Sequence, residues 1–362
     1  MKSKISIGIL AYNEALSISQ TLHSLFEQSL FNRADTDIEI LVVANGCTDD
    51  TSVIACSTLE QLVKPIIQPH ISWNICEIKE AGLANAWNNY VHDLSSPQSN
   101  YLIVMSADIQ FLDLQTLESL VQTLEAHAEA WVSVDRRIKD IALKEKKTLA
   151  EKISTLVSEM SGSKQVEEEA AWISGQLYCA RSKILRKIQM PTTLPTDDAF
   201  LYTMIVTDSL KDSIQPKRVI LAKSASHVFE AYTQVSRLFR HEKWLIFGQT
   251  VNELLYADLL AHSKQEEDVS LLIRQRNEQD PFWLNKLVQT AIKTKGWWLI
   301  PKFILTRRFQ SLAYKPFLKS ILLFPLVMVA FIVDLFLSFQ VNLEMQNRGG
   351  FNNWTSSGSW GK

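Results

Sequence analysis

Short apolar runs alternate with helix-like segments along the first part of this 362-residue chain. The apolar runs predict buried strands, and apolar residues three or four apart between them predict helices. The predicted strands are 5–10, 38–44, 73–78, 101–105 and 130–134, and the predicted helices are 14–27, 83–94 and 114–127. Strands that alternate with helices imply βαβ units, so we expect an α/β fold with a mainly parallel sheet flanked by helices.

Beyond residue 225 the pattern becomes helical. Residues 234–262 and 281–295 predict helices, and the polar stretch 263–280 between them is expected to be exposed. Upstream, residues 144–160 predict a polar helical insertion, and 170–179 predict a return to the sheet. The chain then divides into an α/β domain at 1–226, a helical extension at 227–300, a basic aromatic membrane-surface segment at 301–320, a transmembrane helix at 321–341 and a flexible tail at 342–362.

The transmembrane prediction rests on residues 321–341, which are nearly all apolar. As a helix this run is roughly 30 Å long, the thickness of a bilayer core. Bases gather just before it and are sparse after it, so the positive-inside rule predicts a single-pass protein of the cell inner membrane with its large N-terminal part in the cytoplasm. Asp334 supports the alternative of a buried soluble helix, because a central charge costs about 2.5–3.5 kcal/mol on insertion. Apolar neighbours can outweigh that cost, and Asp334 can face a partner.

Composition excludes several classes of function. The formal net charge of -2 gives no case for broad nucleic-acid binding, which needs a basic surface. Four scattered cysteines form neither a CxxC motif nor a zinc pattern with histidines, which indicates reduced thiols. The apolar run at 5–10 is too short for the core of a signal peptide.

Acidic and amide side chains stand where the predicted strands end. Glu14 follows the first strand, Asn45 follows the second, and Asp108 follows the fourth. Ligands of open α/β sheets bind outside the carboxyl ends of the strands. One carboxylate can hold a metal–diphosphate there, while the downstream pair Asp197-Asp198 can deprotonate a hydroxyl. That division of labour suits the transfer of a sugar from a nucleotide diphosphate.

The order and spacing of these motifs resemble those of family 2 glycosyltransferases, which have the GT-A fold. The matching segments are 5–14, 41–51, 80–88, 101–108 and 196–201, within roughly the first 245 residues. The resemblance implies an inverting enzyme that moves a sugar from a nucleotide-diphosphate donor to a saccharide or lipid-linked acceptor. It also implies Mg²⁺ or Mn²⁺ as cofactor.

The resemblance assigns the nucleotide to the loops after the first two strands, with Tyr12, Glu14, Asn45 and Asp49 as binding residues. An ionised Glu14 accepts hydrogen bonds from a ribose or base. Asn45 stands where the family often has Asp, and its amide both donates and accepts. The alternatives are a helix cap for Glu14 and a helix N-terminal charge for Asp49.

Residues 80–88 resemble the family's Gly-Lys-x-x-Ala-x-Asn region, which implies donor contacts for Gly82, Asn85 and Asn88. Gly82 lets the backbone approach a diphosphate, and a helix N-terminus favours anions. Lys79 is displaced from the family's lysine, which weakens the case for a phosphate contact there. The alternative is an ordinary turn from strand to helix.

Ser106-Ala107-Asp108 stands where the family has Asp-x-Asp, so the resemblance makes Asp108 the metal ligand. Mg²⁺ and Mn²⁺ prefer hard oxygen ligands, and Ser106 is a weaker one. The alternative is an Asp108 that caps a helix or is merely exposed.

Asp197-Asp198 matches the family's Glu-Asp pair, and Asp198 takes the position of the catalytic base. Two close carboxylates raise the pKa of one of them. The alternative is purely structural, with Thr196 as the N-cap of a helix at 197–207.

Residues 240–244 resemble an incomplete Gln-x-x-Arg-Trp motif, with Arg240 in place of Gln and Lys243 in place of Arg. The resemblance implies that Arg237 and Arg240 steady the leaving diphosphate and that Trp244 contacts the acceptor. Trp172 falls in the family's acceptor loop and can stack on a sugar face. A solvated basic helix face and a core tryptophan are the alternatives. The incomplete motif argues against a processive polymerase.

The departures at Ser106, Lys79 and 240–244 leave a second interpretation open. It is a degenerate GT-A domain that binds a nucleotide sugar or a partner without catalysis. A nucleotidyltransferase is less favoured, because no Gly-rich basic loop follows the first strand.

Overall fold

The chain forms two compact units. The computed structural model describes residues 2–63, 70–143, 171–230, 234–263, 268–313 and 315–348. The described residues up to 230, together with 268–279, make up the first unit, and 234–263 with 280–348 make up the second. The predicted insertion at 144–160 and most of the predicted tail at 342–362 lie outside the described residues.

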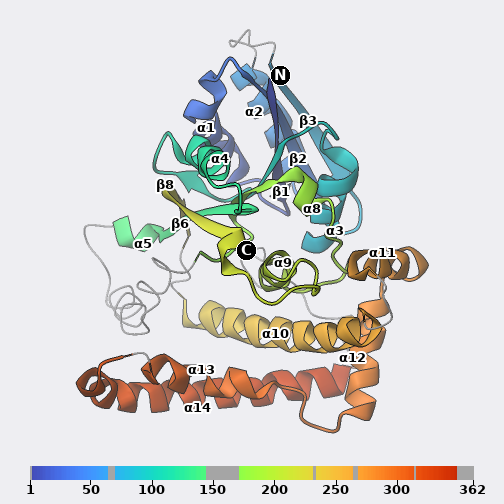
Figure 1. Cartoon of the computed structure of the whole chain (residues 1–362), viewed down its shortest axis with the longest axis vertical. Helices are drawn as coiled ribbons and strands as arrows, with labels where there is room; N and C mark the ends of the chain where they lie inside the picture. Colours follow the sequence, from blue (N-terminus) through green and yellow to red (C-terminus); the bar gives the residue numbers. More distant parts are fainter. Residues whose placement is uncertain are drawn as a thin grey trace. The chain divides into compact units, whose positions relative to one another are not determined.

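The first unit is built on an eight-stranded sheet with the order β3-β2-β1-β4-β7-β6-β8-β5 (Figure 1). Its strands are β1 (Ser3–Ala11), β2 (Thr36–Asn45), β3 (Ile71–Ile78), β4 (Tyr101–Ser106), β5 (Gln110–Phe111), β6 (Val132–Lys139), β7 (Leu177–Arg181) and β8 (Val219–Phe229). β1 pairs in parallel with β2 and β4, and β2 pairs in parallel with β3, as the alternating pattern predicts. β7 runs antiparallel to β4 and β6, and β5 runs antiparallel to β8, so the other half of the sheet is mixed.

Burial explains why β1 is a continuous apolar run and β3 is not. Ile5, Ile7 and Ile9 of β1 are fully buried, because strands flank β1 on both sides and helices cover the sheet. β3 lies at the edge of the sheet, and its exposure alternates along the strand. A half-exposed edge strand needs only one apolar face.

Helices bury their apolar faces against the β1 isoleucines. Three helices contribute buried residues to the main hydrophobic core, namely α1 (Ile18–Phe26), α2 (Thr51–Val63) and α4 (Thr116–Ala126). The other helical elements before α10 are η1 (Ser29–Asn32), α3 (Leu83–Asn88), the π-helical turn η2 (Asn89–Leu94), α5 (Asp140–Leu143), α8 (Ser182–Leu185), α9 (Asp197–Val206) and η3 (Pro216–Arg218). The single helix expected at 83–94 is therefore α3 followed by a wider turn.

The polar stretch at 263–280 contains a helix, α11 (Val269–Gln279), which the sequence pattern did not predict. Val269 and Ile273 are buried, so the expectation of a wholly exposed segment was wrong for them. The α11 side chain of Asn277 donates to the carbonyl oxygen of Met190 at 2.8 Å. This contact ties α11 to the first unit.

The described residues of the second unit form four helices. They are α10 (Val235–Ser263), α12 (Trp283–Thr294), α13 (Lys302–Ala313) and α14 (Phe317–Arg348), and α14 packs against both α10 and α13. Within α14, residues Lys319–Asn347 are long and apolar enough to cross a membrane. Asp334 is buried in the middle of this stretch and bonds to Arg307 and Arg308 of α13. The Asp334 carboxylate is therefore paired with two arginines of α13.

Candidate active site

Two hydrogen bonds clasp the loop after β1 to the loop after β2. Oδ1 of Asn13 accepts from the Thr48 N–H at 2.7 Å, and the Glu14 N–H donates to Oγ1 of Thr51 at 2.7 Å. Asn13 has a left-handed backbone with φ 55°, which asparagine tolerates better than most residues. Glu14 is buried, and its carboxylate accepts from the Ser17 hydroxyl at the start of α1. Glu14 thus stabilises the start of α1, and its contact with a nucleotide remains a prediction.

Asp49 secures the same pair of loops from the β2 side. Its carboxylate accepts from the Ala15 N–H at 3.1 Å, and from the N–H and the hydroxyl of Thr51 at 3.1 Å and 2.5 Å. Burial by itself would raise the pKa of Asp49, but these hydrogen bonds hold its pKa below the ordinary value. Asp49 is therefore ionised at neutral pH beside the first turn of α2, where a negative charge is favourable.

The end of β2 also contacts the segment before α3. Oδ1 of Asn45 accepts from the Gly82 N–H at 3.1 Å, and the Gly46 N–H donates to the Ile78 carbonyl at 2.7 Å. Gly46 is left-handed with φ 64°, and a Cβ there would lie 2.6 Å from Cβ of Ala81. Only glycine fits this conformation and this close approach. The loops after β1, β2 and β3 thus form one continuous edge of the sheet.

The two asparagines predicted to contact the donor make internal hydrogen bonds. Nδ2 of Asn85 donates to the Glu80 carbonyl at 3.1 Å. Asn88 is buried, and its amide exchanges hydrogen bonds of 2.8 Å and 3.0 Å with the backbone of Met190. Both residues shape the chain around Gly82. Donor contacts for Asn85, Asn88 and the half-buried Tyr12 remain predictions.

The two acidic motifs come together where β4 meets β7. The Ser106 N–H donates to the Gln176 carbonyl at 2.9 Å, and Asp108 lies just beyond Ser106. A Cβ on Gly175, the residue before Gln176, would lie 3.3 Å from Oδ2 of Asp197. Gly175 and Gln176 therefore touch the Asp108 loop on one side and the start of α9 on the other. Segments far apart in the sequence therefore meet at one place in the first unit.

Asp197 and Asp198 differ in their surroundings. Asp197 is buried, whereas Asp198 is half-buried and its Oδ1 accepts from the Ala199 N–H at 2.7 Å. Burial, followed by the negative charge of Asp198, raises the pKa of Asp197 to about 7. The pair therefore gains its second negative charge only near neutral pH. The sequence argument expected one raised pKa in this pair; it belongs to Asp197 and not to Asp198, the predicted base.

A stacked aromatic pair, the exposed Trp172 and the half-buried Tyr202, lies one helical turn from Asp198. Trp172 is 45% exposed, and its ring stacks on that of Tyr202 with centroids 4.0 Å apart and planes 25° apart. Tyr202 follows Asp198 by one helical turn on α9, so the two side chains share a face of that helix. Trp172 is thus a surface residue and not the core tryptophan of the alternative interpretation. Tyr202 was not predicted as a site residue, because nothing in the sequence pairs it with Trp172.

A buried polar pair adjoins the same junction and was also missed. Nδ1 of His227 donates to Oδ2 of Asp135 at 2.6 Å, and Nε2 of His227 lies 3.3 Å from Oε1 of Gln176. Both Asp135 and His227 are buried. A lone histidine within β8, and an acid following the predicted strand at 130–134, were the available signals. Neither belongs to a motif that sequence reasoning could use.

The remaining predicted contacts belong to the second unit. Arg237, Arg240 and Trp244 all lie on α10. Arg240 is exposed, and the ring of Trp244 packs 5.9 Å from that of Phe247 between centroids. Their contacts with a diphosphate and an acceptor remain predictions.

Asp108 is the residue best suited to a divalent ion. Among the residues that the structure describes, no three His, Cys, Asp or Glu side chains form a group that could hold a metal. A closed protein cage is therefore absent from this part of the chain. Mg²⁺ is usually held by one or two carboxylates together with substrate phosphates and water, and the half-buried Asp108 fits that mode.

Comparison with known proteins agrees with the architecture. The family model for glycosyl transferase family 2 matches residues 6–188, which is half of the chain. No curated protein sequence matches the chain significantly.

Solved structures are similar in fold. One is a mannosyltransferase from Pyrobaculum calidifontis in complex with GDP-mannose and Mn²⁺, with 17% identity, a TM-score of 0.52, and 96% of this chain and 88% of that chain covered. Another is a glucosyl-3-phosphoglycerate synthase from Mycobacterium tuberculosis with bound Mn²⁺, UDP-glucose and phosphoglyceric acid, with 12% identity, a TM-score of 0.43, and 65% and 74% covered. The likeness to the mannosyltransferase confirms the predicted GT-A fold.

Proposed function

This chain belongs to glycosyl transferase family 2 and is a glycosyltransferase, and we propose that it transfers a sugar from a nucleotide-diphosphate donor to a hydroxyl of a saccharide or lipid-linked acceptor with inversion. The observation that carries the proposal is the meeting of two acidic motifs at Gly175 and Gln176. Sugar transfer needs one group to manage the leaving diphosphate and another to activate the attacking hydroxyl.

Asp198 is the proposed general base. It is the more accessible acid of its pair, while the buried Asp197 has the raised pKa. Asp198 removes the proton of the acceptor hydroxyl as that oxygen bonds to the anomeric carbon. The bond from that carbon to the diphosphate oxygen breaks, and the diphosphate leaves with the electron pair. Attack opposite the leaving group inverts the anomeric centre.

The donor is proposed to lie along the edge formed by the loops after β1, β2 and β3. Glu14, Asn45 and Asp49 would bind the nucleotide, with Tyr12 beside them, and the backbone at Gly82 would face the diphosphate. The clasp between these loops supports this placement, because a preorganised site loses less entropy on binding. Asp49 offers a fixed charge there, since hydrogen bonds keep it ionised.

A divalent ion is the proposed cofactor. When bound, Mg²⁺ or Mn²⁺ would offset the negative charge of the leaving diphosphate. Asp108 would hold it, together with phosphate oxygens and water. Support comes from the mannosyltransferase of the same fold, which is described with GDP-mannose and Mn²⁺.

The acceptor is proposed to approach over Trp172 and Tyr202. The exposed Trp172 ring of this stack offers an apolar face of the kind that packs against sugar rings, and Tyr202 beneath it lies one helical turn from Asp198. The long apolar helix α14 supports a lipid-linked acceptor, because such a helix would hold the chain at a membrane.

The test is to assay the full chain in its membranes with a panel of nucleotide-diphosphate sugars, with and without Mg²⁺ or Mn²⁺. We expect one donor to give metal-dependent release of the nucleoside diphosphate. Asp108→Asn should suppress the release, and Asp93→Asn, at an exposed aspartate on η2, should not. A donor that raises the unfolding temperature but is never turned over would instead favour a non-catalytic binding domain. That alternative draws its support from Ser106 in place of the first metal-binding aspartate.

A further inference from the structure

Apolar side chains are exposed along α14, among them Leu322, Phe324 and Leu335, and six of the exposed apolar residues form a row on one side of the helix. We call it the apolar stripe, and it consists of Ile321, Val329, Ile332, Phe336, Phe339 and Leu343. Each of these residues is at least 40% exposed, and successive members lie on the same side of the helix. No Asp, Glu, Lys or Arg belongs to the stripe. An exposed apolar surface of this length marks a binding face.

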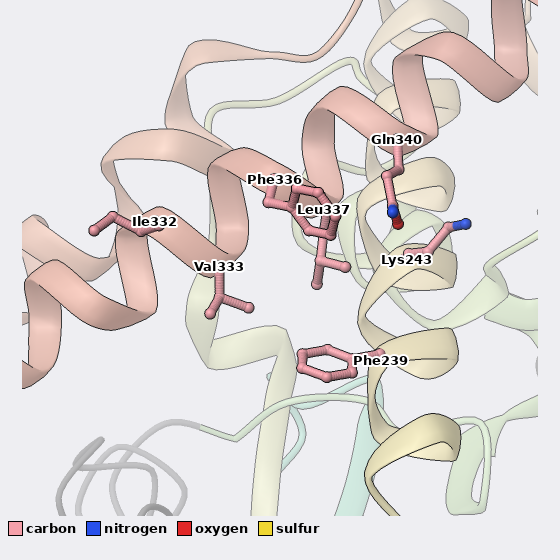
Figure 2. Close-up of a pocket in the computed structure, with 7 residues that line it drawn as sticks. All are labelled: Phe239, Lys243, Ile332, Val333, Phe336, Leu337 and Gln340. Atoms are coloured by element: carbon pink, nitrogen blue, oxygen red, sulfur yellow. The ribbon is translucent and has the colours of Figure 1, made fainter.

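An apolar groove extends the stripe onto α10. It has a volume of about 420 Å³, and Figure 2 shows Phe239 of α10 opposite Val333, Phe336 and Leu337 of α14. Lys243 lies at the groove and pairs with Glu344 of α14. The apolar surface thus spans two helices, and the charged residues at its edge, Lys243 and Glu344, pair with each other.

The opposite face of α14 is polar at the centre of the candidate span. Residue 333 is the midpoint of Lys319–Asn347, and Asp334 beside it is only 1% exposed. The carboxylate of Asp334 accepts from Arg307 at 2.9 Å and from Arg308 at 2.9 Å, and Arg307 also donates to Glu242 of α10 at 3.1 Å. Four ionised side chains from three helices therefore meet at the level of the helix centre.

Polar contacts continue toward the C-terminal end of α14. Asn342 is buried, donates to the Trp297 carbonyl at 2.8 Å and accepts from the Leu299 N–H at 2.9 Å. Gln346 donates to the same Trp297 carbonyl at 2.9 Å. A crossing α14 would have to carry α13, part of α10 and this loop into the bilayer. Among the described helices, only α14 is long and apolar enough to cross a membrane.

We propose that α14 does not cross the membrane but lies in its surface, with the apolar stripe dipping into the lipid and the ion network facing the protein. A helix that turns apolar side chains to lipid and its charged side chains to the protein can lie in the plane of the interface. Trp297 is 52% exposed and packs on Phe339 of the stripe, at the boundary where membrane proteins concentrate tryptophan. The exposed Lys302 and Lys319 complement anionic headgroups. The proposal rests on the second unit alone and does not depend on sugar transfer.

Depth measurements along the stripe test the proposal. Ile321, Ile332 and Leu343 are exposed and spaced eleven residues apart, so they share one face and successive positions are separated by about 16 Å along the axis. Each is changed to cysteine in the full chain, with the half-buried native cysteines replaced by serine, and labelled with a fluorophore. The labelled proteins are bound to vesicles of phosphatidylcholine and phosphatidylglycerol. These vesicles carry nitroxide quenchers either at the headgroup or deep in the acyl chain.

We expect the same shallow depth at all three positions, with the headgroup quencher more effective at each. Val53→Cys, at an exposed apolar residue of α2 in the first unit, is the matched control and should not be quenched by either lipid. A profile in which position 332 is deep and positions 321 and 343 are shallow would establish a transmembrane helix and overturn the proposal. Loss of quenching at all three positions would overturn it as well, because the stripe would then be covered by protein, such as a second copy of this chain.

Discussion

Replacing Gly46 by alanine should destabilise the loop that joins β2 to α2. The expected loss of free energy has two parts. The first part is the left-handed backbone, φ 64°, which costs an L-residue about 1–2 kcal/mol. The second is overlap, since the new Cβ would lie 2.6 Å from Cβ and 2.8 Å from Cα of Ala81. Forcing an extra carbon into a packed site typically costs about 1–3 kcal/mol. The total is about 2–5 kcal/mol.

Gly296→Ala is the matched control. Gly296 is also left-handed, with φ 89°, but no atom of the described residues lies within 4 Å of the point that a Cβ would occupy. It should lose only the backbone part, about 1–2 kcal/mol. Hydrogen exchange read by mass spectrometry on peptides around each site measures the local free energy of opening. Equal losses at the two glycines would refute the close packing of Gly46 on Ala81. The Gly46 variant should also bind the donor nucleotide more weakly than the Gly296 variant, because the Asn45–Gly82 contact lies next to the overlap.

Three further results are expected. Gly175→Ala places a methyl group 3.3 Å from Oδ2 of Asp197, and we expect kcat to fall by about tenfold with donor affinity unchanged, measured by steady-state kinetics and nucleotide titration. The raised pKa of Asp197 means that the folded protein holds a proton that the unfolded chain releases. The free energy of unfolding should therefore decline as pH rises from about 4 to about 7. Asp197→Asn lacks this titration, so its unfolding temperature should rise relative to that of wild type between about pH 5 and about pH 8. Asp334→Asn leaves two arginines without their buried counter-charge and should cost about 3 kcal/mol in opening of α14, measured by hydrogen exchange.

The strands at the centre of the sheet were the easiest elements to predict. The apolar runs 38–44 and 101–105 lie within β2 (Thr36–Asn45) and β4 (Tyr101–Ser106), because strands buried on both faces leave an uninterrupted apolar signal. β8 (Val219–Phe229) carries Lys223, Ser224 and Ser226, and it continues through residues where the pattern suggested a change to helix. Its mixture of polar and apolar residues hid an inner strand of the sheet.

Local motifs located the ends of the strands but could not show which loops meet. That Ser106, two residues before Asp108, and Asp197 approach the neighbouring residues Gln176 and Gly175 depends on the antiparallel pairing of β7 with β4. Long-range pairing of this kind has no local signal. For the same reason, the sequence showed that a charge at Asp334 is costly to place in a membrane but did not show that Arg307 and Arg308 of α13 pair with it.

The rate of sugar transfer by Asp198→Asn, compared with its affinity for the donor, tests the central claim most directly. With the donor identified, the account predicts that kcat falls by about 10²–10⁴-fold, the usual contribution of a positioned base. The Kd for the donor should stay within a factor of about two, because the base meets the acceptor and not the nucleotide, and Asp93→Asn should match wild type in both. A folded Asp198→Asn protein that transfers sugar at the wild-type rate would contradict the account.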